Sequence, residues 1–181
     1  MLSIVSAVTF GQGIQRSSYK WFRGSIGGFK EQASPYLGGI TFNLNICRLD
    51  TRLIQMPTKI KNTNDLWTAR LGGYANFGDE HNMGIYYDAD LLYGKCTGGT
   101  LNAYISGGAG IMGGYYAERQ VFPPGVLMTV DRKFINLNVP LEAGINLNSK
   151  VIGIGLAAFV NLNRTRPLTG FFICLNLGRV K

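Results

Sequence analysis

Charged residues are scarce in this sequence. Only 15% of its 181 residues are Asp, Glu, Lys or Arg, against about 25% in an average soluble domain, so an ordinary solvated surface is not expected. Hydrophobic residues make up 46% of the chain, which excludes a disordered protein. No apolar run approaches the roughly 18 residues that a membrane-spanning helix needs, which excludes a helical membrane protein. At this length one domain is the default.

Cysteine is scarce as well. Cys47, Cys96 and Cys174 are far apart and show no CxxC or other metal-ligand spacing, so neither a cysteine metal site nor a disulfide framework is expected. An oxidising compartment would allow one intramolecular bridge, but we expect three unpaired small side chains.

The excess of basic residues does not select one partner by itself. The net charge of +8 comes from 18 Lys and Arg against 10 Asp and Glu, which suits nucleic acid and acidic lipid headgroups equally well. The basic residues form no dense run, and no nucleic-acid-binding motif is found. We therefore expect no nucleic acid partner and keep membrane lipids as the candidate.

The main signal in the sequence is an alternation of apolar and polar residues with a period of two, which is typical of β-strands with two different faces. Aliphatic residues occupy the odd positions from Ile135 to Leu147, with Asn or Gly at most positions between them. After a tight turn at 148–150, the apolar row continues on the even positions from Ile152 to Leu162. This switch places both rows on one side of a hairpin.

The same pattern predicts eight strands with no helix between them. Eight antiparallel strands in sequence indicate an all-β fold, an up-and-down barrel. The segments 49–65 and 117–133 are predicted to be the longest loops, and Pro140 predicts a bulge or a position at the rim. The predicted strands cover residues 19–29, 40–47, 67–77, 83–93, 101–116, 134–148, 152–162 and 171–178.

Such a barrel exists in a water-soluble form and in an inverted membrane form. The polar rows consist of Asn, Gly, Tyr, Ser and a few single charges, with hardly any lysine, which favours a filled lumen over a solvated surface. We therefore predict an eight-stranded antiparallel up-and-down transmembrane β-barrel, whose closure satisfies the backbone hydrogen bonds within lipid. Trp67 and Tyr93 are among the aromatic residues near strand ends, where aromatic girdles are expected. The residues predicted to face lipid are Leu137, Leu141, Ile145, Ile152, Ile154, Leu156, Ile173 and Leu175.

Four charged residues, Arg70, Asp88, Asp90 and Glu142, lie on the polar rows and are predicted to form a network in the lumen. If the hairpin of residues 67–93 is symmetric about its loop, Arg70 lies beside Asp90 and one diagonal step from Asp88. This network is either a polar constriction that selects solutes or a set of ion pairs that plugs the barrel. Eight strands leave an interior that side chains just fill, which favours the plug.

His81 is the only histidine and lies in the loop Gly78–Asn82. Catalysis there would need a nucleophile and an orienting carboxylate beside it. Asp79 and Glu80 are adjacent, but no Gly-x-Ser-x-Gly motif accompanies them. Three adjacent residues rarely converge on one metal ion. We therefore predict a solvated loop, with no catalytic residue, no metal site and no cofactor.

The C-terminal part of the chain resembles a known family. The stretches VPLEAGINL, GIGLAAFVNLN and FFICLNLGRVK, within Phe134–Lys181, resemble small outer-membrane β-barrel proteins of the Bacteroidota type, OmpX/OmpA-like eight-stranded barrels. Leu101–Tyr116 agrees more loosely. The resemblance implies a barrel in the cell outer membrane and no particular activity. This chain departs from the better-known terminal aromatic residue by ending in Arg-Val-Lys.

The predicted function is that of a non-catalytic structural or interaction component in the outer membrane of a Gram-negative cell, as a subunit of a larger assembly. Its partners would be outer-membrane lipids and other outer-membrane proteins, contacted through the long loops or the lipid-facing wall. Two alternatives stay open. One is a lipid-modifying barrel enzyme of the deacylase or acyltransferase kind, and the other is a soluble barrel that carries a lipophilic ligand.

The first residues, Met1–Phe10, have the composition of the hydrophobic part of a secretory signal, and Thr9 and Gly11 are small residues at the −3 and −1 positions of a cut before Gln12. A basic region before them is missing, so an apolar first strand is the alternative. We take residues 1–12 as a signal-peptide remnant and 13–181 as a single β-barrel domain.

Overall fold

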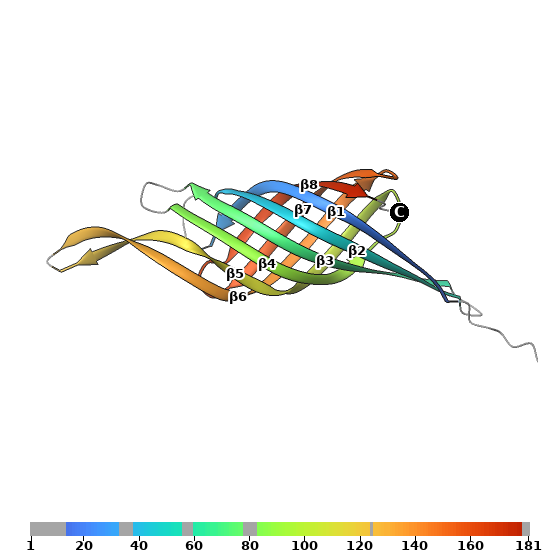
Figure 1. The fold of residues 1–181 in the computed structure, drawn as a ribbon, viewed down its shortest axis with the longest axis horizontal. Coiled ribbons are helices and arrows are strands. Elements are labelled where there is room, and N and C mark those ends of the chain that lie inside the picture. Colours follow the sequence, from blue (N-terminus) through green and yellow to red (C-terminus); the bar gives the residue numbers. More distant parts are fainter. Residues whose placement is uncertain (1–13, 33–37, 56–59, 78–82, 124, 179–181) are drawn as a thin grey trace, which may run out of the picture.

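The computed structural model describes residues 14–32, 38–55, 60–77, 83–123 and 125–178. Its strands pair antiparallel in chain order, and β8 returns to β1 to close a barrel (Figure 1). The predicted eight-stranded up-and-down barrel is therefore confirmed. Among the described residues, no helix is long and apolar enough to cross a membrane. The strands are β1 Ile14–Glu31, β2 Ile40–Gln55, β3 Ile60–Phe77, β4 Met83–Cys96, β5 Leu101–Phe122, β6 Val126–Asn148, β7 Ile152–Asn163 and β8 Leu168–Gly178.

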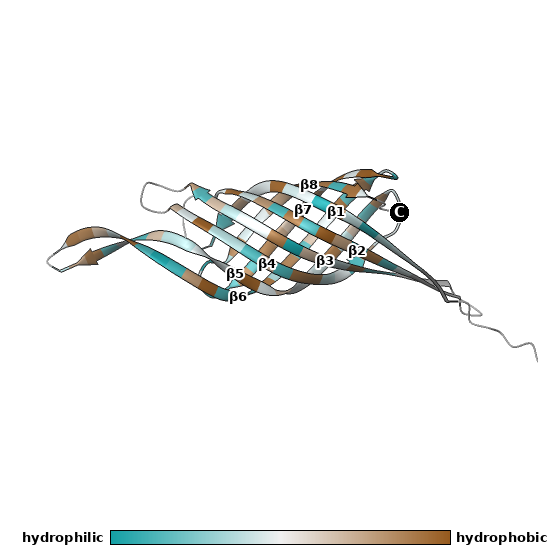
Figure 2. Ribbon diagram, in the orientation of Figure 1, coloured by the Kyte–Doolittle hydropathy of each residue, from teal (hydrophilic) through white to brown (hydrophobic). Residues whose placement is uncertain are grey.

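The strand registers follow from the alternation. Trp67 pairs with Tyr93 across β3 and β4, as the symmetric hairpin predicts. Ile145 pairs with Leu156 across β6 and β7, so the odd row of one strand and the even row of the next lie on the same face. Hydrophobic and hydrophilic residues alternate along the strands (Figure 2). A shift by one residue would exchange the two faces of a strand, which is why this pattern fixes the pairing.

Both predicted long loops are wrong, because strands continue through them. β2 and β3 extend to Gln55 and from Ile60, and β5 and β6 extend to Phe122 and from Val126. The ends of β5 and β6 project from the barrel as a two-stranded ribbon (Figure 1). Residues 126–129 are exposed one after another. Strands with no buried face need no alternation, so the pattern used to find strands is absent there.

Pro140 lies within β6, and the β5–β6 pairing is interrupted beside it. The paired positions resume on both sides in one register, Gly107 with Leu141 and Gly110 with Asn138. Proline has no N–H to donate to a ladder, so the interruption needs no inserted residue. The prediction of a bulge or a rim position is therefore wrong.

The predicted first strand, 19–29, is part of the longer β1. Its alternation is hidden because Trp21 and Arg23 point inward, 5% and 2% exposed, while Phe22 is 65% exposed on the outer face. The signal-peptide prediction falls on residues outside those that the structure describes, and it stays a prediction.

Candidate functional site: a charged network in the barrel lumen

The apolar rows form the outer wall of the barrel. The eight residues predicted to face lipid all lie there with large exposed fractions, up to 82% for Leu137. Trp67 and Tyr93 are exposed beside them, with ring centroids 4.7 Å apart. A water-soluble carrier would bury these residues around its ligand, so the soluble alternative is wrong. The other predicted lipid-facing residues are Leu141, Ile145, Ile152, Ile154, Leu156, Ile173 and Leu175.

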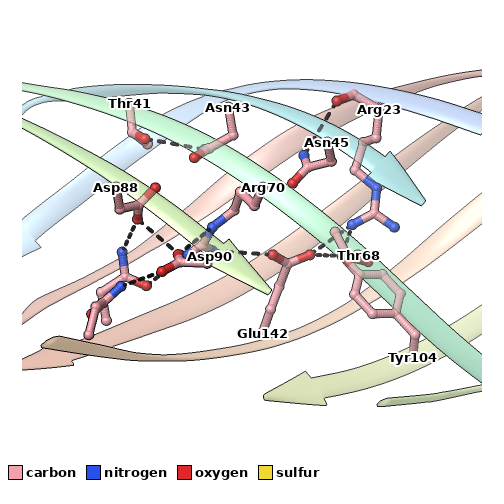
Figure 3. Close-up of polar contacts among 12 residues, drawn as sticks. Arg23, Thr41, Asn43, Asn45, Thr68, Arg70, Asp88, Asp90, Tyr104 and Glu142 are labelled. Carbon is pink, nitrogen blue, oxygen red and sulfur yellow. Dashed lines mark hydrogen bonds and ion pairs between the residues drawn. The ribbon is translucent and has the colours of Figure 1, made fainter. Parts of the chain in front are cut away.

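The polar rows turn into the lumen, where Arg70 on β3 is the centre of a buried network (Figure 3). Its Nη2 donates to Oδ2 of Asp90 at 2.5 Å and to Oδ2 of Asp88 at 3.2 Å. Its Nη1 lies 3.4 Å from Oε2 of Glu142. The structure thus brings all four predicted lumen residues together, each at most 4% exposed. Asn161 on β7 adds an acceptor 2.7 Å from Nη2.

Arg23 on β1 is a second centre of this network, which the sequence analysis missed. Its Nη1 donates to Oε1 of Glu142 at 2.8 Å and to the Tyr104 hydroxyl at 2.9 Å. Its Nε donates to Oδ1 of Asn176 at 3.1 Å. Glu142 therefore lies between two guanidinium groups and joins β6 to β1 and β3 across the lumen. The sequence could have indicated Arg23 only through its place on an inward-facing row of β1. The weak alternation of apolar and polar residues in this strand concealed that row.

The asparagines of the polar rows extend the network along the barrel. Nδ2 of Asn138 donates to Oδ1 of Asp90 at 3.1 Å. Nδ2 of Asn161 donates to Oδ2 of Asp88 at 2.8 Å, and the Tyr74 hydroxyl donates to the same oxygen at 2.6 Å. Buried carboxylates need such donors, because burial removes the water that would otherwise solvate them.

A separate ion pair lies near the turn between β7 and β8. Arg166 in that turn pairs with Glu31 at the end of β1 and lies 3.8 Å from the ring centre of Tyr116. Partial burial lowers the pKa of Arg166, but Glu31, Tyr86 and Tyr116 together raise this pKa by more, so it lies above its ordinary value and the guanidinium stays charged. Asn76 and Tyr86 also donate to Glu31, at 3.1 and 3.2 Å.

The interior around these groups is filled with large side chains. Arg23, Arg70, Tyr74, Tyr86 and Phe172 are among the largest that are fully buried. Phe159 stacks on Phe172 with ring centroids 4.3 Å apart, and the rings of Phe29 and Tyr74 meet edge to face at 5.5 Å. This packing matches an eight-stranded barrel whose interior is occupied by its own side chains.

Among the described residues, Oδ1 of Asp88 is the one carboxylate oxygen that is buried without a hydrogen-bond partner. Oδ1 of Asp88 and Oδ1 of Asn43 are both without a partner. Both lie over Gly72, where a Cβ atom would be 2.2 Å from the first and 2.6 Å from the second. The network holds two positive charges, on Arg23 and Arg70. It holds three carboxylates, those of Asp88, Asp90 and Glu142. Asp88 therefore carries the charge with the least compensation.

The remaining candidate residues are not part of this network. His81, Asp79 and Glu80 lie outside the described residues, and the catalytic alternative that depends on them stays untested. Within the described part of the chain, no group of three His, Cys, Asp or Glu side chains could hold a metal ion. Cys47, Cys96 and Cys174 are free, which confirms the prediction of unpaired thiols.

Solved structures share this fold. Neisserial surface protein A matches with a TM-score of 0.55 and 7% sequence identity, over 90% of this chain and 98% of its own. Ail, the attachment invasion locus protein of Yersinia pestis, matches with a TM-score of 0.52 and 13% identity, over 93% and 99%. The outer membrane enzyme PagL matches with a TM-score of 0.43 and 12% identity, over 89% and 99%.

No protein-family model matches the sequence, and no curated protein matches it. At identities this low, the structural likeness to Neisserial surface protein A and Ail concerns the fold alone. Together with the closed ladder and the apolar outer wall, it shows that this chain has the fold of the small outer-membrane β-barrel proteins.

Proposed function

We propose that this protein is a non-catalytic interaction component of the outer membrane, which anchors a projecting β-ribbon for contact with another membrane or envelope protein. The observation that carries the proposal is the ribbon of β5 and β6, residues 117–133. Beyond Tyr116, β5 pairs only with β6 among the described strands. Figure 2 shows hydrophobic residues at the far end of this ribbon. The large exposed hydrophobic residues there are Val121, Phe122, Val126, Leu127 and Met128.

Residence in the outer membrane is supported by physical requirements of the barrel. A hydrophobic wall around a closed ladder is stable in lipid, where every backbone donor and acceptor must be satisfied internally. The wall of this barrel exposes aliphatic side chains on all eight strands. The C-terminal stretches resemble barrels of the Bacteroidota type, and from this resemblance we propose that the protein comes from this group of bacteria. This proposal concerns the source of the protein and not its activity.

An interaction role fits the interior better than transport does. Fully buried arginine, tyrosine and phenylalanine side chains occupy the lumen, and the ion pairs join strands on opposite sides of it. The catalytic alternative has no contact in its favour among the described residues. The ribbon, by contrast, exposes apolar side chains outside the barrel wall, and clusters of this kind mark sites of protein contact.

The test uses photo-crosslinking in intact cells. A photoreactive amino acid at Val121 or Leu127 should crosslink to one and the same partner protein, which then co-purifies with the barrel in mild detergent. Val151, an exposed residue in the short turn between β6 and β7, is the matched control at the other end of the barrel. Crosslinking at Val121 and Leu127 that does not exceed the level at Val151 would show that the ribbon is not the interaction element.

A further inference from the structure

Two basic side chains lie opposite each other at the end of the barrel where the described chain begins and ends. Lys20 on β1 pairs in register with Arg48 on β2, and both are exposed on the outer face. They line a hollow of about 500 Å³ together with Ser18 and Tyr19. Like charges directly opposite each other on neighbouring strands destabilise a sheet. An anion between them would relieve this repulsion.

The hollow lies at the edge of the apolar outer wall. The next outward-facing pair along the two strands is Phe22 and Ile46, which are 65% and 57% exposed and belong to the apolar wall. On the other side, Arg48 pairs with Trp67, and Trp67 contacts Tyr93. Exposed aromatic residues at the edge of an apolar wall mark the boundary between hydrocarbon and headgroups.

The donors of the two basic groups are largely free. Lys20 has no ion pair or side-chain hydrogen bond among the described contacts. Arg48 uses Nε to donate to Oδ1 of Asp50 at 2.9 Å. Neither Nη1 nor Nη2 of Arg48 has a partner among these contacts. The three charged groups Lys20, Arg48 and Asp50 leave a net positive charge at the hollow.

We propose that this hollow binds the phosphate group of an anionic phospholipid. Arg48 would present its two free Nη groups to two phosphate oxygens, and Lys20 would contribute a point charge from the facing strand. The acyl chains of the same lipid would lie along Phe22 and Ile46 on the wall. A lipid is the expected source of the phosphate because the basic pair is continuous with this apolar surface, so one molecule satisfies both.

The test compares variants of the full chain, folded in a zwitterionic detergent. The probe is dihexanoyl phosphatidylglycerol, added as monomers, and native mass spectrometry counts the bound lipid. We expect a complex with one lipid in the unmodified protein. The double variant Lys20→Gln, Arg48→Gln should bind about 10- to 30-fold more weakly, since each basic group near a membrane surface contributes a factor of about 5. Lys30→Gln, an exposed lysine at the other end of β1, is the matched control and should bind as the unmodified protein does.

Two outcomes would overturn the proposal. Equal binding by the double variant and the Lys30→Gln variant would place the lipid elsewhere. Full displacement of the lipid by millimolar inorganic phosphate would show that the hollow recognises free phosphate and gains nothing from the acyl chains. Lys20 and Arg48 are exposed, so we expect the double variant to be at least as stable to unfolding as the unmodified protein. This measurement is the control that lost binding does not reflect lost folding.

Discussion

Arg70 holds Asp90 across the β3–β4 pair with two donors on one oxygen. Nη2 and Nε of Arg70 lie 2.5 and 3.1 Å from Oδ2 of Asp90, and the side chains of both residues are fully buried. Neither charge is hydrated, so each depends on the other for its stability. Because Arg70 also reaches Asp88 and Glu142, its guanidinium compensates three carboxylates at once.

Replacing Arg70 with methionine should therefore destabilise the barrel severely. Arg70→Met leaves buried carboxylates without their main cation, which costs about 3–5 kcal/mol in comparable buried pairs. Urea-induced unfolding in lipid vesicles, followed by tryptophan fluorescence, measures the change in the free energy of unfolding. Arg132→Met is the matched control, because Arg132 is half exposed and its pair with Glu118 at 3.5 Å should contribute less than about 1 kcal/mol. Equal losses in the two variants would contradict the central role of Arg70.

The Arg70–Asp90 contact could be predicted because it is local in the sequence. The two residues lie on one hairpin with a short loop, and the alternation fixes its register. The contact between Arg23 and Glu142 could not be predicted in this way. Those residues are on β1 and β6, and they meet only because the closed barrel brings distant strands around one lumen. The ribbon of β5 and β6 was missed for a different reason, since none of its described residues is buried and its two faces therefore do not differ.

Asp88 and Asp90 should respond differently to neutralisation. In Asp88→Asn, the new amide group can replace the unpartnered Oδ1 and donate to Oδ1 of Asn43, while the remaining oxygen keeps its donors from Arg70, Tyr74 and Asn161. This change also removes the uncompensated charge. We expect the free energy of unfolding to stay the same or rise by about 1 kcal/mol.

In Asp90→Asn, by contrast, no oxygen is free to be replaced. Oδ1 of Asp90 accepts from Asn138 and Oδ2 accepts from Arg70, so an amide group would face another donor in either orientation. We expect a loss of about 1–3 kcal/mol, measured by the same urea titration. A larger loss for Asp88→Asn than for Asp90→Asn would show that Asp88 is the better-compensated carboxylate.

Two of the three free thiols should be protected by the barrel. Cys47 and Cys174 are 0% and 1% exposed, and they lie on lumen-facing rows. A maleimide reagent should label neither residue within minutes in the folded protein, and both should react at once after unfolding in urea. Mass spectrometry of the digested protein measures this labelling residue by residue. Rapid labelling of Cys174 in the folded state would mean that the lumen opens to solvent.

A filled lumen should not conduct ions. The purified barrel, inserted into a planar lipid bilayer, should give no steady conductance above that of the protein-free membrane, because buried side chains and ion pairs occupy its interior. A porin inserted under the same conditions is the positive control. Stable conductance steps that scale with protein concentration would favour the solute-selecting constriction over the plug.

Gly72 and Gly73 offer the sharpest test of the two faces of the wall, because they are adjacent on β3 and differ in what surrounds them. A Cβ atom at Gly72 would come within 2.2 Å of Oδ1 of Asp88 and 2.6 Å of Oδ1 of Asn43, while a Cβ at Gly73 would meet only the Phe42 carbonyl oxygen at 4.0 Å. Gly72→Ala should therefore lower the free energy of unfolding by about 1–3 kcal/mol. Gly73→Ala should leave it unchanged or raise it, since alanine restricts the unfolded chain. The two substitutions have the same chemistry on the same strand, so opposite outcomes can only come from the face that each residue occupies, and equal outcomes would contradict the packed polar lumen.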